Sequence, residues 1–156
     1  MLDEQKTLEF RQKFENSFPD LMKFFQECKD RYHLKGQVHT MAGRPRPLPD
    51  TKNAHPQNKA AAERQAVNTI IQGSASDLVK MSMLHVHRMI KLQDMEARLL
   101  LQMHDELLFE VQKNDLNEFV KMLQVEMPSV ANHLPLKFPV CLRFGPSWGE
   151  LRDWNG

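Results

Sequence analysis

The sequence has 156 residues, of which 41% are apolar and 26% are charged, with a formal net charge of +1. The charged N-terminus leads into no apolar run, and no stretch is long and apolar enough for a bilayer. We therefore expect no secretory signal and no membrane span. The two cysteines, Cys28 and Cys141, fit no metal-binding spacing, which favours a reduced, intracellular setting.

The small net charge conceals a basic segment. Between Lys29 and Arg64, eight Lys or Arg stand against three Asp or Glu, and three His lie in the same stretch. Such a segment suggests an anionic partner, with nucleic acid as the leading candidate. A solvated surface stretch is the alternative.

The first third of the chain predicts helices followed by a hairpin. Apolar residues at helical spacing over residues 2–34 predict two helices, with Pro19 in the first turn of the second and Gly36 at its end. Residues 36–49 carry glycine and three prolines and predict a short hairpin or an irregular loop. Residues 50–58 predict an exposed connection.

A long helix is predicted from Lys59 to about Leu92. Gly73 lies inside it at a cost of about 1 kcal/mol relative to Ala, which indicates that another backbone or a ligand comes close. One face of this helix is formed by seven residues, most of them apolar: Val67, Ile70, Ile71, Ser74, Leu78, Met81 and His85.

The C-terminal part predicts a further helix and a last strand. Asn114 or Asp115 caps a helix that Pro128 ends or kinks, and Lys137–Phe144 reads as a strand. With the hairpin described next, the fold class is α+β, with helices packed on a small antiparallel sheet.

Two strands, Arg98–Met103 and Glu106–Val111, are predicted on either side of His104 and Asp105. Alternation puts one set of apolar residues on one face of each strand: Leu99, Leu101 and Met103, then Leu107, Phe109 and Val111. Leu100 and Leu108 on the opposite faces suggest that both sides of the hairpin are covered.

Three ionisable residues, His104, Asp105 and Glu106, join these strands. Ionised carboxylates at the end of a buried hairpin need a cation or hydrogen-bond donors, and Mg²⁺ prefers such oxygen ligands. The alternatives are a polar turn, in which Asp is common, and a transition-metal cluster of His85, His87 and His104. His85 and His87 are two residues apart on a helix and point in different directions, which disfavours the cluster.

A polar stripe runs along the long helix. Arg64, Asn68 and Gln72 are spaced four residues apart and therefore share one side. A guanidinium can meet a phosphate, and two amides can meet base edges along a minor groove, where A·T and T·A pairs offer similar acceptors. A solvated helix face is the alternative.

In combination, these segments resemble a known family. The stretch AAERQAVNTIIQGSASDLVK followed by QMHDELLFEV is similar to the long helix and the final catalytic motif of family A DNA polymerases. Upstream, GQVHTMAGRPRPLP resembles a stretch that in the family usually contains Gly-Arg-Arg-Arg. The ending SWGEL is similar to that of the eukaryotic repair branch, the theta and nu polymerases. The resemblance runs from about residue 10 to residue 154.

The resemblance implies a role for each matched residue. Asp105 would be a ligand of the catalytic Mg²⁺ ions, Glu106 a supporting carboxylate, and His104 a neighbour of the primer 3′ end. Primer–template DNA would be bound by Arg64, Asn68 and Gln72 of the long helix. Arg44 and Arg46 of the hairpin would contact a DNA strand or pack the fingers. Residues 1–58 would be part of the fingers and residues 59–156 part of the palm, together forming one folding unit. The location would be the nucleus if the chain belongs to the eukaryotic repair branch.

Several departures from the family pattern limit these expectations. Pro45 replaces the usual middle Arg, Gln37 replaces an aromatic residue, and the linker near residues 93–97 lacks a long insertion typical of theta enzymes. The first metal-binding motif and the nucleotide-binding helix are absent from these 156 residues. Deoxynucleoside triphosphates would therefore be bound through an upstream part, and we expect this chain alone to be inactive. The alternatives are a non-catalytic DNA-binding or interaction module derived from such an enzyme, and a metallohydrolase that uses the 104–106 turn.

Overall fold

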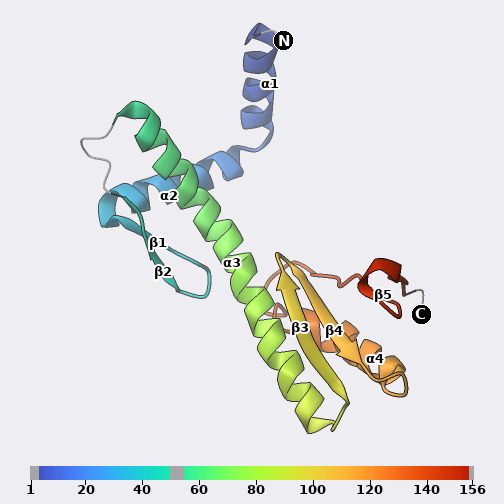
Figure 1. The fold of residues 1–156 in the computed structure, drawn as a ribbon. Helices are drawn as coiled ribbons and strands as arrows, with labels where there is room; N and C mark the ends of the chain where they lie inside the picture. Colours follow the sequence, from blue (N-terminus) through green and yellow to red (C-terminus); the bar gives the residue numbers. More distant parts are fainter. Residues whose placement is uncertain (1–3, 50–54, 155–156) are drawn as a thin grey trace. The chain divides into compact units, whose positions relative to one another are not determined.

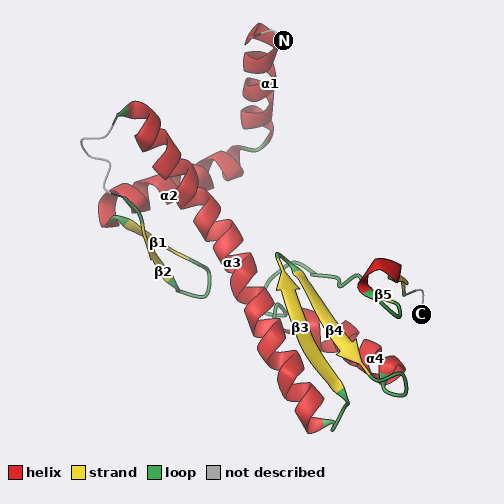
Figure 2. Cartoon of the chain, viewed as in Figure 1, coloured by secondary structure: helices red, strands yellow, loops and turns green. Residues whose placement is uncertain are grey.

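The computed structural model describes residues 4–49 and 55–154 (Figure 1). Figure 2 shows helices alternating with short antiparallel hairpins, which confirms the α+β class. The elements in chain order are α1 (Glu4–Ser17), α2 (Pro19–Lys35), β1 (Gln37–His39), β2 (Pro45–Pro47), α3 (Pro56–Leu92), β3 (Ala97–Met103), β4 (Glu106–Val111), α4 (Leu116–Ser129), β5 (Arg143–Phe144), the 3₁₀ turn η1 (Trp148–Glu150) and β6 (Arg152–Asp153).

The chain forms two compact units, one ending at Ser74 and the other beginning at Ala75. Helix α3 contributes residues to both. No helix among residues 4–49 and 55–154 has the length and apolar character that a membrane crossing requires.

The first unit holds the two predicted N-terminal helices and the predicted hairpin. Helix α2 has Pro19 in its first turn and ends at Gly36, whose φ of 64° is left-handed and whose N–H donates to the Tyr32 carbonyl at 2.8 Å. The β1–β2 hairpin pairs Val38 with Arg46. The core of this unit contains Tyr32, Val38, Leu48, Ala62 and Ala66.

The predicted connection over residues 50–58 lies partly outside the described residues, which resume at His55. Helix α3 begins at Pro56, three residues before the predicted start, because proline is well suited to a first helical turn. Its packed side matches the predicted face only in part: Ile70 packs against the core of the first unit and Ser74 is buried. Ile71 and Met81 are exposed, whereas Ala66 and Val86 are fully buried, since small side chains let neighbouring elements approach the helix closely.

The second unit packs α4 and one face of the β3–β4 hairpin on the C-terminal part of α3. Phe109 and Phe119 meet edge to face with ring centroids 5.2 Å apart. Their cluster consists of Val86, Ile90, Phe119, Met122 and Leu123, with Met89, Met95, Ala97, Phe109, Val111, Met127 and Leu142 around them.

The ends of α4 differ from the expected capping. Asp115 occupies the N-cap position but its side chain makes no capping hydrogen bond. Its carboxylate instead accepts a hydrogen bond from the Glu96 N–H at 2.9 Å. The helix continues through Pro128 and ends one residue later.

Two strand predictions were wrong in detail. Only Arg143–Phe144 of the predicted strand 137–144 pairs, because the partner β6 has two residues and Pro139 has no N–H to donate. In β3, the register shifts between Leu99 and Leu101, so that Leu100 is a bulge and Leu101 lies opposite Leu108.

The bulge changes which residues share a face. Directly paired residues lie on one side of a sheet, so Leu101 and Met103 fall on the face opposite to Leu99 and Phe109. That second face is open: Leu100 is 51% exposed and Leu101 41% exposed. The expectation that both sides of the hairpin are covered was therefore wrong.

Candidate nucleic-acid interface and metal-binding turn

In the first unit, polar side chains of α3 line an open depression of about 360 Å³. Arg64, Asn68 and Gln72 lie one turn apart along it and are all exposed, as the four-residue spacing predicts. The complete lining is Arg46, Ala61, Arg64, Gln65, Asn68, Thr69, Gln72 and Gly73. The depression therefore combines two guanidinium groups with the amide donors and acceptors of three side chains.

The hairpin brings Arg46, from β2, to this depression. Arg44 has a different place, because its Nη2 donates to the Gly73 carbonyl at 3.4 Å. The backbone around Arg44 is also fixed, since Thr40 N–H donates to the Arg44 carbonyl at 3.0 Å and the Arg44 N–H donates to Thr40 Oγ1 at 3.2 Å. Arg46 therefore lines the depression, whereas the exposed Arg44 bonds to the carbonyl of Gly73, which is one of the lining residues.

A close contact at Gly73 lets the hairpin rest on α3. A Cβ built on Gly73 would lie 2.8 Å from Thr40 Cγ2, well inside ordinary van der Waals contact. Next to it, the Met41 N–H donates to Ser74 Oγ at 2.8 Å. A close approach at Gly73 is therefore present, but the approaching group is the side chain of Thr40 and not the backbone or ligand that the sequence predicted.

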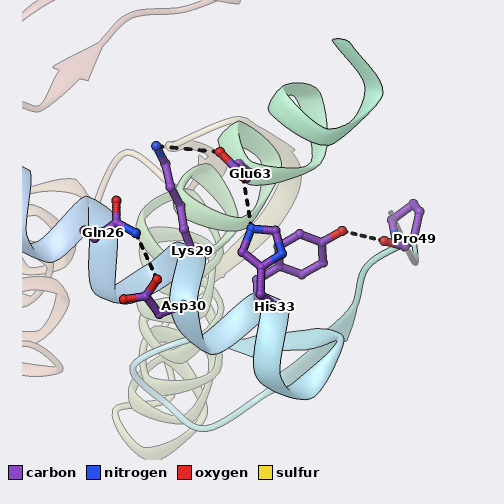
Figure 3. A network of polar contacts seen from close by, with 7 residues as sticks. Gln26, Lys29, Asp30, His33, Pro49 and Glu63 are labelled. Carbon is purple, nitrogen blue, oxygen red and sulfur yellow. Dashed lines mark hydrogen bonds and ion pairs between the residues drawn. The ribbon is translucent and has the colours of Figure 1, made fainter. Parts of the chain in front are cut away.

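A polar cluster fixes the start of α3 on α2 (Figure 3). Glu63 lies between two basic side chains: its Oε2 is 3.7 Å from Lys29 Nζ and its Oε1 is 3.0 Å from His33 Nε2. Tyr32 adds a hydrogen bond from its hydroxyl to the Pro49 carbonyl at 2.5 Å. Glu63 was not among the site residues predicted from the sequence, because its contacts join segments 30 or more residues apart.

In the second unit, His104 and Asp105 form a two-residue turn between Met103 and Glu106. His104 has a φ of 52°, a left-handed conformation that is uncommon for residues other than glycine. Gln102 Nε2 donates to the His104 carbonyl at 3.2 Å. All three predicted catalytic residues are exposed, so the desolvation argument for a cation at a buried hairpin end does not apply to this chain.

The two carboxylates of the turn have different surroundings. Arg143 Nη2 donates to Glu106 Oε1 at 3.2 Å. Within the described part of the chain, no hydrogen bond or ion pair engages the Asp105 carboxylate. An exposed oxygen ligand of this kind fits Mg²⁺, which commonly binds through one or two carboxylates together with substrate phosphates. Arg143 was missed because 37 residues separate it from Glu106 and no spacing rule connects them.

The alternative histidine cluster is not assembled. His85 Nε2 is 2.6 Å from Glu126 Oε2, and His87 is exposed. Among the residues that the structure describes, no three His, Cys, Asp or Glu side chains converge as metal ligands. Asp105 would thus be a single ligand that relies on further oxygen donors.

Sequence comparison identifies relatives of the chain. Residues 1–150 match DNA polymerase family A. DNA polymerase I of Chloroflexus aurantiacus is 38% identical over 134 residues, covering 86% of this chain and 14% of the relative. DNA polymerase I of Bacillus caldotenax is 33% identical, covering 97% of this chain and 17% of the relative. The chain therefore spans about one sixth of the length of these relatives.

A eukaryotic relative matches as well. DNA polymerase theta of Mus musculus is 32% identical over 175 aligned positions, covering 91% of this chain and 7% of the relative. Because the alignment exceeds the 156 residues of this chain, the theta relative has extra residues inside the matched region. Bacterial and eukaryotic relatives match at similar identity, so identity does not assign the chain to the repair branch.

A solved structure supports the same relationship. The POL domain of Pol1 from M. smegmatis, in complex with DNA primer-template and dNTP, is 34% identical. The match has a TM-score of 0.75 and covers 85% of this chain and 24% of that chain. With the family match over residues 1–150, these similarities establish that the chain belongs to DNA polymerase family A.

Proposed function

We propose that this chain forms part of a template-directed DNA polymerase, in which it grips the primer–template duplex and supplies one catalytic metal-binding carboxylate. The observation that carries the proposal is the depression on α3, where Arg46, Arg64, Asn68 and Gln72 meet. Guanidinium groups suit phosphates and amides suit base edges, so the lining is matched to a duplex read mainly through its backbone and minor groove. The similar M. smegmatis domain is itself bound to primer-template.

The hairpin turn would serve the chemical step. Asp105 would hold the metal, Glu106 would support it, and His104 would lie near the primer 3′ end. Bound Mg²⁺ would stabilise the attacking 3′-oxygen of the primer and the leaving oxygen of a deoxynucleoside triphosphate. Residues 1–58 would belong to the fingers and residues 59–156 to the palm. Arg44, whose guanidinium bonds to the Gly73 carbonyl beside the depression, would fix the hairpin on α3.

Duplex binding by the 156-residue chain tests the α3 assignment. We expect Arg64→Ala to lower the slope of log affinity against log salt by about one unit, because one phosphate contact and its counterion are lost. Asn68→Ala and Gln72→Ala should weaken binding without changing that slope. Gln72→Ala should also raise sensitivity to mismatches near the primer end. Arg88→Ala removes an exposed arginine of the same helix outside the depression and serves as the control.

Fluorescence anisotropy of a labelled primer–template across a salt series gives all five affinities. If the three depression variants and the Arg88 control bind like the unchanged chain, the stripe is ordinary helix surface. In that case the duplex-binding assignment fails.

The metal assignment needs an active enzyme. A suitable one is a chimera in which this chain replaces the matched segment of the Bacillus caldotenax relative, which spans 97% of the chain. In that chimera, Asp105→Asn should abolish primer extension while sparing duplex binding, because the amide keeps the shape and loses the charge. Glu106→Gln should be milder. Near-normal extension by the Asp105 variant would favour a non-catalytic DNA-binding role for this segment.

A further inference from the structure

We propose that Arg143 is a positioning residue that occupies the Glu106 carboxylate and thereby leaves Asp105 as the metal-binding carboxylate of the turn. This inference rests on the proposed function. The contact that carries it joins Arg143 Nη2 to Glu106 Oε1 at 3.2 Å and links β5 to the first residue of β4.

The backbone on both sides of Arg143 is fixed, which gives the guanidinium a defined origin. On one side, Leu142 packs against the core of the second unit and its carbonyl accepts a hydrogen bond from the Trp154 N–H at 2.9 Å. On the other side, Phe144 packs edge to face on Trp154 with ring centroids 5.0 Å apart. The β5–β6 pair therefore presents Arg143 to the turn from an anchored position.

The pair contributes little to folding. The Arg143 side chain is 51% exposed and that of Glu106 is 58% exposed, and exposed ion pairs are weak because water and salt screen them. The ion pair instead affects which carboxylate of the turn is available to a metal ion. Two adjacent carboxylates could share one cation, but a guanidinium that hydrogen-bonds Glu106 competes with the metal for that carboxylate. The contact with Arg143 thus makes the Glu106 carboxylate less available to a metal ion than the Asp105 carboxylate.

The inference predicts a signed effect on metal binding. When Arg143 is replaced by Met, Glu106 is released and can join Asp105 as a second ligand. Metal affinity at the turn should then rise by about two- to fivefold, the range that one exposed charge pair allows. Arg143→Lys keeps the charge and one donor and should restore most of the original affinity.

The test uses Mn²⁺ as a paramagnetic probe on the isotope-labelled 156-residue chain. Broadening of backbone amide signals from residues 103–106 reports the Mn²⁺ concentration at half-effect for the parent, Arg143→Met, Glu106→Gln and the double variant. We expect tighter binding only in Arg143→Met, and loss of that gain in the double variant. Arg98→Met is the matched control, because it removes an arginine paired with Glu110 on the same hairpin, away from the turn.

The outcomes separate the two proposals. Broadening centred on Asp105 that is equal in the parent and in Arg143→Met overturns the role of Arg143 and leaves the metal site standing. A gain in the double variant equal to that in Arg143→Met also overturns it, since the effect would then be general charge. Absence of broadening at the turn in every variant overturns the metal assignment itself and this inference with it.

Discussion

Replacing Gly73 with Ala tests how closely the hairpin packs on α3. The new methyl carbon would lie 2.8 Å from Thr40 Cγ2, whereas carbon atoms in good contact are about 3.5–4.0 Å apart. Thr40 is buried and its hydroxyl accepts the Arg44 N–H, so its side chain has little freedom to move. Overpacking of this kind costs about 1–3 kcal/mol, against which Ala gains about 1 kcal/mol over Gly in a helix interior.

With Thr40 unchanged, Gly73→Ala should therefore lower the free energy of unfolding by between about 0 and 2 kcal/mol. When the methyl group of Thr40 is removed, the same substitution should instead raise the free energy of unfolding. Thr40→Ser keeps the hydroxyl and deletes Cγ2. In that background Gly73→Ala should stabilise the chain by up to about 1 kcal/mol. The coupling between the two substitutions is then about 1–3 kcal/mol.

Urea unfolding followed by circular dichroism gives the four free energies of the cycle, with equal m-values as the check on comparability. Thr69→Ser is the matched control, because Thr69 Cγ2 is 3.9 Å from the same built Cβ, an ordinary contact. It should not rescue Gly73→Ala. Effects of Gly73→Ala and Thr40→Ser that add within about 0.5 kcal/mol would refute the close contact.

Four further outcomes follow from the structure. His104→Gly should raise the free energy of unfolding by about 1 kcal/mol by relieving the left-handed φ, while slowing primer extension by the chimera. Cys28 is 1% exposed and burial raises its pKa, so iodoacetamide should label Cys141 in the folded chain and Cys28 only on unfolding. Because the pKa of Cys28 is raised in the folded chain, the free energy of unfolding should be unaffected by this thiol below the ordinary thiol pKa of about 8.5 and should fall as the pH rises above it. Urea titrations at pH 7 and pH 10 would detect the decrease. The 156-residue chain alone should extend no primer with Mg²⁺, since Asp105 is one ligand where two ions need several; steady template-dependent extension would contradict this.

Local patterns in the sequence predicted the elements that depend on local interactions. The helices follow from periodicity, the stop at Gly36 from the freedom of glycine to adopt a left-handed conformation, and the turn at His104 and Asp105 from polar residues between two apolar runs. The exposed line of Arg64, Asn68 and Gln72 follows from the helical repeat alone, and the intrahelical glycine indicated the close approach.

Features that depend on pairing between distant segments were not predictable in this way. The bulge at Leu100 is a property of the pairing between β3 and β4, with three residue pairs on each side of it. The alternation of apolar residues within one strand does not reveal such a shift in register. The contact of Arg143 with Glu106 and that of Glu63 with Lys29 and His33 require the fold to be known. The 104–106 turn was predicted to lie at the end of a buried hairpin, and this was wrong for the same reason. The prediction assumed a further element covering the hairpin, which the sequence pattern of the two strands cannot show.

The bulge in β3 also bears on how the length of this segment can vary. The three pairs before Leu100 and the three after it differ in register by a single residue. Removing Leu100 would join them into one regular ladder, with Leu99 still opposite Phe109 and Leu101 still opposite Leu108. No side chain would change face, and the turn that carries Asp105 would keep its place on β4. Position 100 can therefore be lost during evolution without altering the residues proposed to carry the chemistry.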